Sequence, residues 1–299
     1  MDFGIWYAGV ASYADPGPAA TLARAAEAAG FESLWAGEHV AVPAEHATPY
    51  PYSPDGKMPG GGAIPMAEPL VWYAYAAALT ERIRFATGVL VVPQRNPLLL
   101  AKQVATLDRL AGGRFSLGVG IGWLREEFEV LGASFERRAE RLEEFVAALR
   151  AIWSSGPEGA TFRGEHVAFE RLHVTPAPAS GPVPIVVGGH TEAAARRAGR
   201  IGDGFFPAKG SPERIERLLA LARESALATG RDAAALELTV ADPGLLGPEP
   251  LEAVERWQRI GAARILMPPP SLDPSEAADK IAAFGEAVIA RTGPASSRH

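Results

Sequence analysis

The chain has 299 residues, of which 47% are hydrophobic and 21% charged, a composition typical of a globular protein with one large domain or two small ones. The net charge of -6 is spread along the chain without a basic run, which argues against nucleic acid as a partner. Cysteine is absent, which excludes disulfides, thiolate nucleophiles and cysteine-ligated metals and favours a cytoplasmic protein.

Short apolar runs alternate with segments of helical period along the whole chain. The predicted strands are residues 3–7, 31–36, 83–90, 114–119, 183–187, 203–206, 236–241 and 263–267. The predicted helices are residues 18–29, 69–80, 97–111, 137–153, 191–201, 211–230, 249–260 and 273–291. This alternation favours an α/β fold, a closed (β/α)8 TIM barrel, over an open doubly wound sheet, which stays the alternative because pattern alone does not show closure.

We expect one domain over residues 1–291 and a disordered tail over residues 292–299. Three helix starts carry a capping side chain followed by proline at the first helical position: Asn96-Pro97, Ser211-Pro212 and Asp273-Pro274.

Two connections are too long to be simple turns. Residues 40–68 are rich in proline and glycine and follow the second strand, so we expect them to form a lid over the ligand-binding end. Residues 154–182 contain a segment, 160–169, that predicts a hairpin. The apolar helix 69–79 is too short to cross a membrane and is suited to a homodimer interface.

In a parallel barrel, ligands bind where the carboxyl ends of the strands open into loops. The second strand runs into Glu38 and His39 at this edge. Histidine has an unperturbed pKa of about 6.5, so His39 can donate or accept a proton at neutral pH. A purely structural histidine explains the position equally well. After the third strand, Gly88 permits close backbone approach to a flat ligand, and Arg95 is more simply explained as a solvated side chain.

The fourth strand ends with glycine at alternate positions 118, 120 and 122, followed by Trp123. This spacing differs from the dinucleotide fingerprint, but it leaves one face of the strand end without side chains, where a flat ring could lie. After the fifth strand, Gly188 and Gly189 precede a helix start of the kind that binds phosphate, although a plain turn is an equally good explanation. The six histidines lack metal-binding spacing, so no metal site is predicted.

Taken together, these strand ends resemble the luciferase-like monooxygenase superfamily. The resemblance is carried by residues 33–39, 86–114, 117–123 and 187–204. Residues 98–122, together with Glu127-Phe128 and Leu131-Gly132, are most similar to the branch of oxidoreductases that use the deazaflavin coenzyme F420. Enzymes that use flavin mononucleotide (FMN) share the same framework.

The resemblance implies a cofactor ring across the carboxyl ends of the strands. Gly88 and Val89, joined in many relatives by a cis bond, would lie beneath the ring. His39 and Glu38 would be catalytic, with His39 assisting proton transfer. The other cofactor-binding residues would be Gly120, Gly122, Trp123 and Glu127 near the ring, and Gly188 and Gly189 at the phosphate.

An apolar substrate pocket would be walled by Trp6, Trp72 and Trp123. Some deazaflavin-dependent sugar and alcohol dehydrogenases of this superfamily carry a carboxylic acid directly after the Gly-x-Gly. Here that position is Trp123, which argues against a sugar dehydrogenase.

We therefore expect an enzyme that transfers a hydride between coenzyme F420 and a small organic substrate. The first alternative is an FMN-dependent monooxygenase that uses oxygen and receives reduced flavin from a partner reductase. The second is a protein of the same fold that binds flavin or deazaflavin without catalysis.

Overall fold

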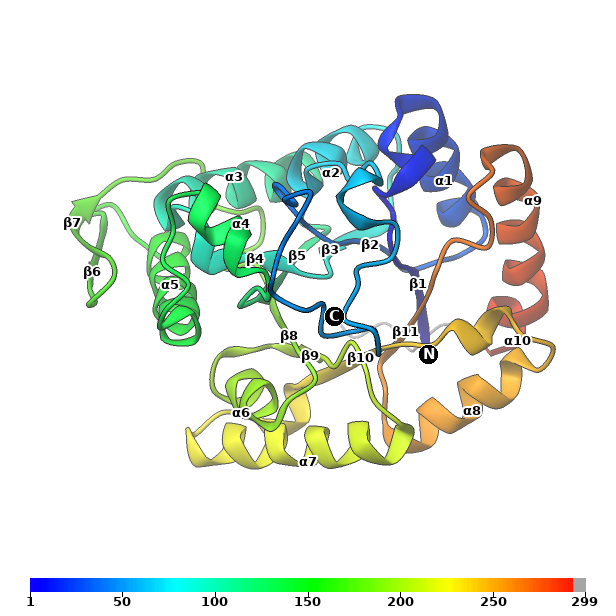
Figure 1. Cartoon of the computed structure of the whole chain (residues 1–299). Helices are drawn as coiled ribbons and strands as arrows, with labels where there is room; N and C mark the ends of the chain where they lie inside the picture. The colour runs from blue at the N-terminus through cyan, green and yellow to red at the C-terminus, as the bar shows by residue number, and fades with distance from the viewer. Residues whose placement is uncertain (293–299) are drawn as a thin grey trace.

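Eight parallel strands form a closed barrel in the computed structural model, which describes residues 1–292 (Figure 1). Each strand pairs with its neighbours, and β3 pairs with β5 while β11 pairs with β1, so the ring has no open edge. The strands are β1 (Asp2–Ile5), β2 (Ser33–Ala36), β3 (Arg84–Thr87), β5 (Phe115–Gly120), β8 (Ile185–Gly188), β9 (Gly204–Phe206), β10 (Glu237–Ala241) and β11 (Arg264–Met267). The predicted TIM barrel is confirmed, and the open sheet is excluded.

Helices surround the barrel and bury one face each against it (Figure 1). They are α1 (Pro16–Ala28), α2 (Pro69–Ala77), α3 (Pro97–Leu110), α5 (Arg138–Trp153), α6 (Glu192–Ile201), α7 (Pro212–Ala228), α8 (Pro250–Ile260) and α9 (Pro274–Phe284). The predicted caps are present: Asn96, Ser211 and Asp273 each accept a hydrogen bond from a backbone N–H of the first turn. These caps satisfy N–H groups that the helix itself leaves unpaired.

The last predicted helix is interrupted. It continues from α9 as a π-helical segment, Gly285–Ile289, and ends in α10 (Ala290–Thr292). A Cβ atom at Gly285 would lie 2.6 Å from the backbone oxygen of Ala29, so glycine allows this segment to approach the end of α1 closely. Residues 293–299 of the predicted disordered tail lie outside the described residues.

Two insertions depart from the barrel plan. Residues 40–68 cross the middle of the ring in Figure 1 and contain a short 3-10 turn, Gly61–Ala63, and an isolated β-bridge from Met66 to Val10. The strands β6 (Ala160–Arg163) and β7 (Ala168–Leu172) pair antiparallel beside α5, outside the barrel, which confirms the predicted hairpin. The short elements that were not predicted include β4 (Leu90–Val91) and α4 (Arg125–Val130).

Within residues 1–292, every helix is too short or too polar to cross a membrane.

Candidate active site

His39 lies just beyond β2 at the carboxyl end of the barrel. Its Nδ1 atom is 2.9 Å from Oε2 of Glu127, a residue of α4. On the other side of the ring, Nε1–H of Trp123 points to Nε2 of His39 at 3.4 Å. The His39 side chain is 12% exposed and that of Glu127 only 2%, so this pair is largely shielded from water.

The two partners of His39 are compatible with one neutral tautomer. An ionised carboxylate only accepts hydrogen bonds, so Nδ1 of His39 carries the hydrogen and donates a hydrogen bond to Glu127. The indole Nε1–H of Trp123 only donates, so Nε2 of His39 faces it with a lone pair. In this geometry Nε2 is the atom of His39 that can accept a proton.

Both oxygens of the buried Glu127 carboxylate form hydrogen bonds with protein groups. Its Oε1 accepts the backbone N–H groups of Val40 at 2.6 Å and Ala41 at 3.1 Å, while Oε2 faces His39. The resemblance implies that Glu127 lies near the cofactor. The structure places it behind His39, where three donors compensate for the loss of hydration of its charge.

The neighbouring Glu126 also holds the segment 40–68, which we call the lid. Oε1 of Glu126 accepts the N–H groups of Ala47 at 2.7 Å and Thr48 at 3.0 Å. Burial opposes the charge of Glu126, but hydrogen bonds from the backbone and from Thr48 outweigh it and lower the pKa of this carboxyl to about 2. Two adjacent carboxylates of α4 therefore fix the first residues of the lid.

Glu38, expected to be catalytic with His39, is held by other protein groups. Its Oε2 accepts the N–H of Val91 at 2.7 Å, and its Oε1 pairs with the guanidinium of Arg95, whose Nε lies at 2.9 Å. Arg95 also contacts Glu68 at 3.0 Å, at the end of the lid. Burial raises the pKa of Glu38, and the charge of Arg95 opposes this rise. The simpler explanation of Arg95 as a solvated side chain was wrong.

Val89 fills the space beside two of the expected cofactor glycines. The Gly88–Val89 peptide is cis, as the resemblance implies, and the Val89 side chain turns toward β5 and β8. A Cβ atom at Gly120 or at Gly188 would lie 2.4 Å from a Val89 methyl group. These glycines therefore accommodate Val89, and the expected bare face for a flat ring is covered by this half-buried side chain.

Gly122 has a different neighbour. A Cβ atom there would lie 2.6 Å from the ring of Phe128, and φ is +75°, a conformation that favours glycine. Gly122 thus lets the chain turn from β5 toward α4.

Basic groups gather at the opposite side of the barrel mouth, after β8 and β9. Gly189, with φ of +130°, leads through His190 to Thr191, whose side chain caps α6. The buried Nδ1 of His190 has no hydrogen-bond partner among residues 1–292. Burial and the nearby charges of Lys209 and Arg214 lower the pKa of His190. A helix start, a pair of cations and an unpaired nitrogen fit an anionic group such as a phosphate.

Lid and barrel aromatic residues meet across the mouth. Trp6 stacks on Tyr7 at 4.2 Å between ring centroids and donates through Nε1–H to the Gly88 carbonyl at 3.2 Å. Burial and the neighbouring lid residues Tyr50 and Tyr52 raise the pKa of Tyr7. Sequence reasoning missed these lid tyrosines because a segment rich in proline and glycine gives no periodic signal.

Trp123 lies at the centre of the lid contacts. Its ring makes edge contacts with His39, His46 and Tyr50, with centroid distances of 5.6, 5.5 and 5.2 Å. Trp72 belongs to α2 and is buried in the hydrophobic core, where its Nε1–H donates to the carbonyl of Tyr13 at 2.8 Å. The structure therefore places Trp6 and Trp123, but not Trp72, at the barrel mouth.

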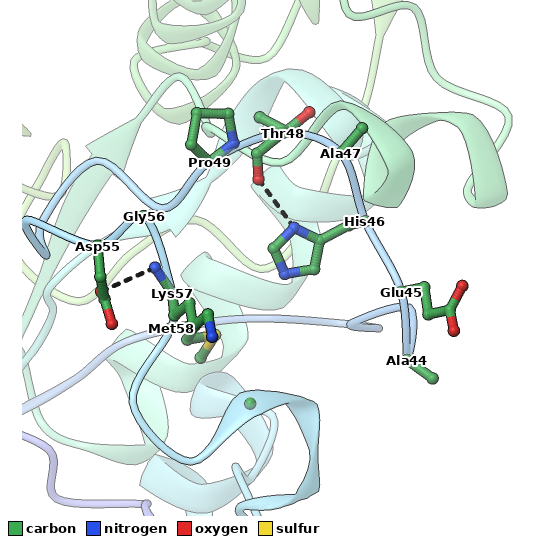
Figure 2. Close-up of a pocket in the computed structure, with 11 residues that line it drawn as sticks. Ala44, Glu45, His46, Ala47, Thr48, Pro49, Asp55, Gly56, Lys57 and Met58 are labelled. Atoms are coloured by element: carbon green, nitrogen blue, oxygen red, sulfur yellow. Dashed lines mark hydrogen bonds between the residues drawn. The ribbon is translucent and has the colours of Figure 1, made fainter.

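A hollow of about 580 Å³ lies within the lid itself (Figure 2). His46 and Thr48 line one side of it, where Nδ1–H of His46 donates to the Thr48 carbonyl at 2.8 Å, and Asp55 and Lys57 line another. None of the expected site residues lines this hollow. In the described chain, no cluster of three or more histidine or acidic side chains is arranged to hold a metal ion.

Comparisons with known proteins agree with the fold. A family model described as luciferase-like monooxygenase matches residues 1–291. The chain is 40% identical over 199 residues to an uncharacterized protein of Mycobacterium tuberculosis, covering 67% of this chain and 68% of that protein. A solved structure of an F420-dependent secondary alcohol dehydrogenase, in complex with an F420-acetone adduct, superposes with a TM-score of 0.75 at 19% identity and covers 96% of this chain and 98% of its own.

Two relatives have names that state a cofactor. One is an F420-dependent glucose-6-phosphate dehydrogenase of Kineococcus radiotolerans, 34% identical over 246 residues, covering 80% of this chain and 67% of that protein. The other is an FMNH2-dependent dimethylsulfone monooxygenase of Pseudomonas fluorescens, 33% identical over 198 residues, covering 65% and 49%. The expected class of oxidoreductase is confirmed: the chain belongs to the luciferase-like monooxygenase family.

Proposed function

We propose that the protein is a deazaflavin-dependent oxidoreductase that transfers a hydride between coenzyme F420 and a small organic substrate, with His39 handling the proton. The observation that carries the proposal is His39 itself, with its Nε2 lone pair at the barrel mouth. The F420-dependent relative described above matches a larger share of this chain than the FMNH2-dependent one, which supports the choice of cofactor.

The residues at the mouth fit such a cofactor. Lys209 and Arg214 offer positive charge for its anionic part, and the unpaired Nδ1 of His190 offers a hydrogen-bonding group beside them. Gly88 and Val89 would support the ring, with Val89 held against Gly120 and Gly188, and Trp6 and Trp123 would lie beside the substrate. When bound, an oxidised deazaflavin supplies an acceptor for a hydride.

The tautomer of His39 favours oxidation of a hydroxyl group. In that reaction the hydride would leave the substrate carbon for the acceptor that a bound F420 would supply. The O–H proton passes to Nε2 of His39, and a carbonyl group forms. Glu38 does not face this step in our proposal, because both of its oxygens are engaged by Val91 and Arg95; it positions Arg95 at the base of the lid. The lid would exclude water from the reaction. We propose that the protein works in the cytoplasm.

A direct test is to titrate purified protein with F420 and with FMN and to follow quenching of tryptophan fluorescence. We expect F420 to bind at micromolar concentration and to be reduced anaerobically by at least one member of a panel of small alcohols. Micromolar binding of FMN without binding of F420 would overturn the cofactor assignment.

A second candidate is favoured by the FMNH2-dependent relative. A monooxygenase would receive reduced flavin from a partner reductase and would consume oxygen with each hydroxylated product. Cofactor binding without turnover in either assay would instead support the non-catalytic alternative.

A further inference from the structure

The two oxygens of the Glu127 carboxylate have separate partners. Oε1 is anchored by the N–H groups of Val40 and Ala41, on the chain that continues directly from His39. Oε2 is thereby directed at Nδ1 of His39, 2.9 Å away. Since the backbone groups hold one oxygen, the carboxylate cannot rotate away from the imidazole without losing two hydrogen bonds.

This arrangement determines which nitrogen of His39 can react. The carboxylate requires a proton on Nδ1, and the indole N–H of Trp123 requires a lone pair on Nε2. The two requirements come from different elements, α4 and the loop before it, and they agree. The Trp123 contact is long, at 3.4 Å, so a substrate hydroxyl can replace it at Nε2 with little loss.

We propose that Glu127 is a positioning residue that fixes the tautomer of His39 and stabilises its imidazolium form after Nε2 has taken the proton. This assignment rests on the proposed function. The imidazolium charge would lie beside a carboxylate that is only 2% exposed, where attraction is stronger than in water. Glu127 thus supplies a carboxylate to the site indirectly, through His39.

The adjacent residue provides a matched control. Glu126 belongs to the same helix and, like Glu127, accepts two backbone N–H groups of the lid. Its partners are Ala47 and Thr48, and it has no contact with His39. Glu126→Gln therefore reports the effect of loosening the lid, and Glu127→Gln adds the loss of the imidazole partner.

The experiment combines nitrogen-15 NMR of the histidine side chains with steady-state kinetics in the full-length protein. In the wild type we expect the Nδ1–H tautomer of His39, assigned by its absence from His39→Gln. In Glu127→Gln the amide oxygen accepts from Val40 and Ala41, and the NH2 group faces Nδ1. We therefore expect the Nε2–H tautomer, because the long contact of 3.4 Å from Trp123 opposes it only weakly. We also expect kcat with F420 and an alcohol to fall roughly 10–100-fold with KM nearly unchanged. Glu126→Gln keeps the wild-type tautomer and changes kcat less than about threefold.

The proposal is overturned if wild-type His39 carries its proton on Nε2, or if Glu127→Gln keeps both the tautomer and kcat. Should Glu127→Gln fail to fold, Trp123→Phe takes its place: it removes the indole N–H and leaves Glu127, so the Nδ1–H tautomer must persist. If the wild type shows the expected tautomer but never reduces F420, the proposed function is wrong and the pairing of Glu127 with His39 is not. The two outcomes can be told apart because NMR measures the pairing in the protein without cofactor.

Discussion

The two sides of the barrel mouth differ in how their polar groups are paired. At the end of β2, Glu38 and Glu127 are buried, and each carboxylate accepts several hydrogen bonds from the protein. At the ends of β8 and β9, positive charge from Lys209 and Arg214 surrounds His190, whose buried Nδ1 has no partner among residues 1–292. In the proposed function the first side is the preorganised proton site, and the second gains its missing interactions from an anion.

This difference indicates a division of roles. Groups that are already fixed before a ligand arrives favour chemistry, because no reorganisation is needed during the reaction. Groups with unbalanced charge favour binding, because an anionic ligand improves their electrostatic environment. We therefore expect substitutions near β2 to affect folding or kcat, and substitutions near β8 and β9 to affect the affinity for the cofactor.

The largest effect should come from Arg95→Met, which breaks the pairing on the β2 side. The Glu38 carboxylate would remain buried without its cationic partner, so we expect the free energy of unfolding to fall by roughly 3–5 kcal/mol. Urea unfolding measures this loss. The double variant Glu38→Gln/Arg95→Met removes the buried charge and should recover part of it. If Arg95→Met is no worse than Arg163→Met, at an arginine side chain that is 81% exposed, the ion pair does not stabilise the fold.

His39→Ala tests whether the β2 side is the proton site. We expect kcat to fall about 100-fold or more, because the variant lacks the Nε2 atom that takes the proton and the neighbouring Trp123 only donates. The affinity for F420 should change little. Anaerobic steady-state kinetics and fluorescence titration measure the two quantities. His173→Ala, at an exposed histidine beyond the hairpin, is the control and should behave as the wild type. Turnover within about threefold of the wild type at every pH would contradict this role.

The sequence predicted the barrel well, because its signals are local. Each strand is a short apolar run, and caps such as Asn96 act within one turn of their helix. It also indicated that His39 lies at a strand end. The partner of His39 could not be predicted, since Glu127 is 88 positions away and lies on a six-residue helix too short to show periodicity.

The role of the alternating glycines also could not be predicted from the sequence. Each one meets a different neighbour: a Cβ atom at Gly118 would collide with the carbonyl oxygen of Thr87, one at Gly120 with Val89, and one at Gly122 with Phe128. A pattern of glycines shows where side chains are missing, but it does not show which neighbour fills the space. The same limit applies to Arg95, whose two acidic partners come from opposite ends of the lid.

Lys209→Met tests whether the β8 and β9 side binds the anionic part of the cofactor. Removing this charge should weaken binding of F420 by about tenfold, the equivalent of one favourable charged contact, without lowering kcat at saturation. The pKa of His190 should rise toward its ordinary value, because the charge of Lys209 is one cause of its depression. Fluorescence titration and NMR titration of His190 measure the two changes. Lys57→Met, at an exposed lid lysine, is the control, and equal losses in both variants would show that only net charge matters.

The smallest effect concerns Glu126, which anchors the lid on the β2 side. Its pKa of about 2 lies below the ordinary 4.5, so the hydrogen bonds to Ala47 and Thr48 stabilise the folded lid fully above pH 4.5 and are lost as the pH falls toward 2. Hydrogen exchange, corrected for intrinsic rates, should show the protection of these two amides decreasing over that range in the wild type. In Glu126→Gln protection should be lower at neutral pH and should not vary between pH 4.5 and 2, because no carboxyl titrates there. The amides of Val40 and Ala41, held by Glu127, should keep their wild-type protection in this variant, since the two carboxylates anchor different residues of the lid.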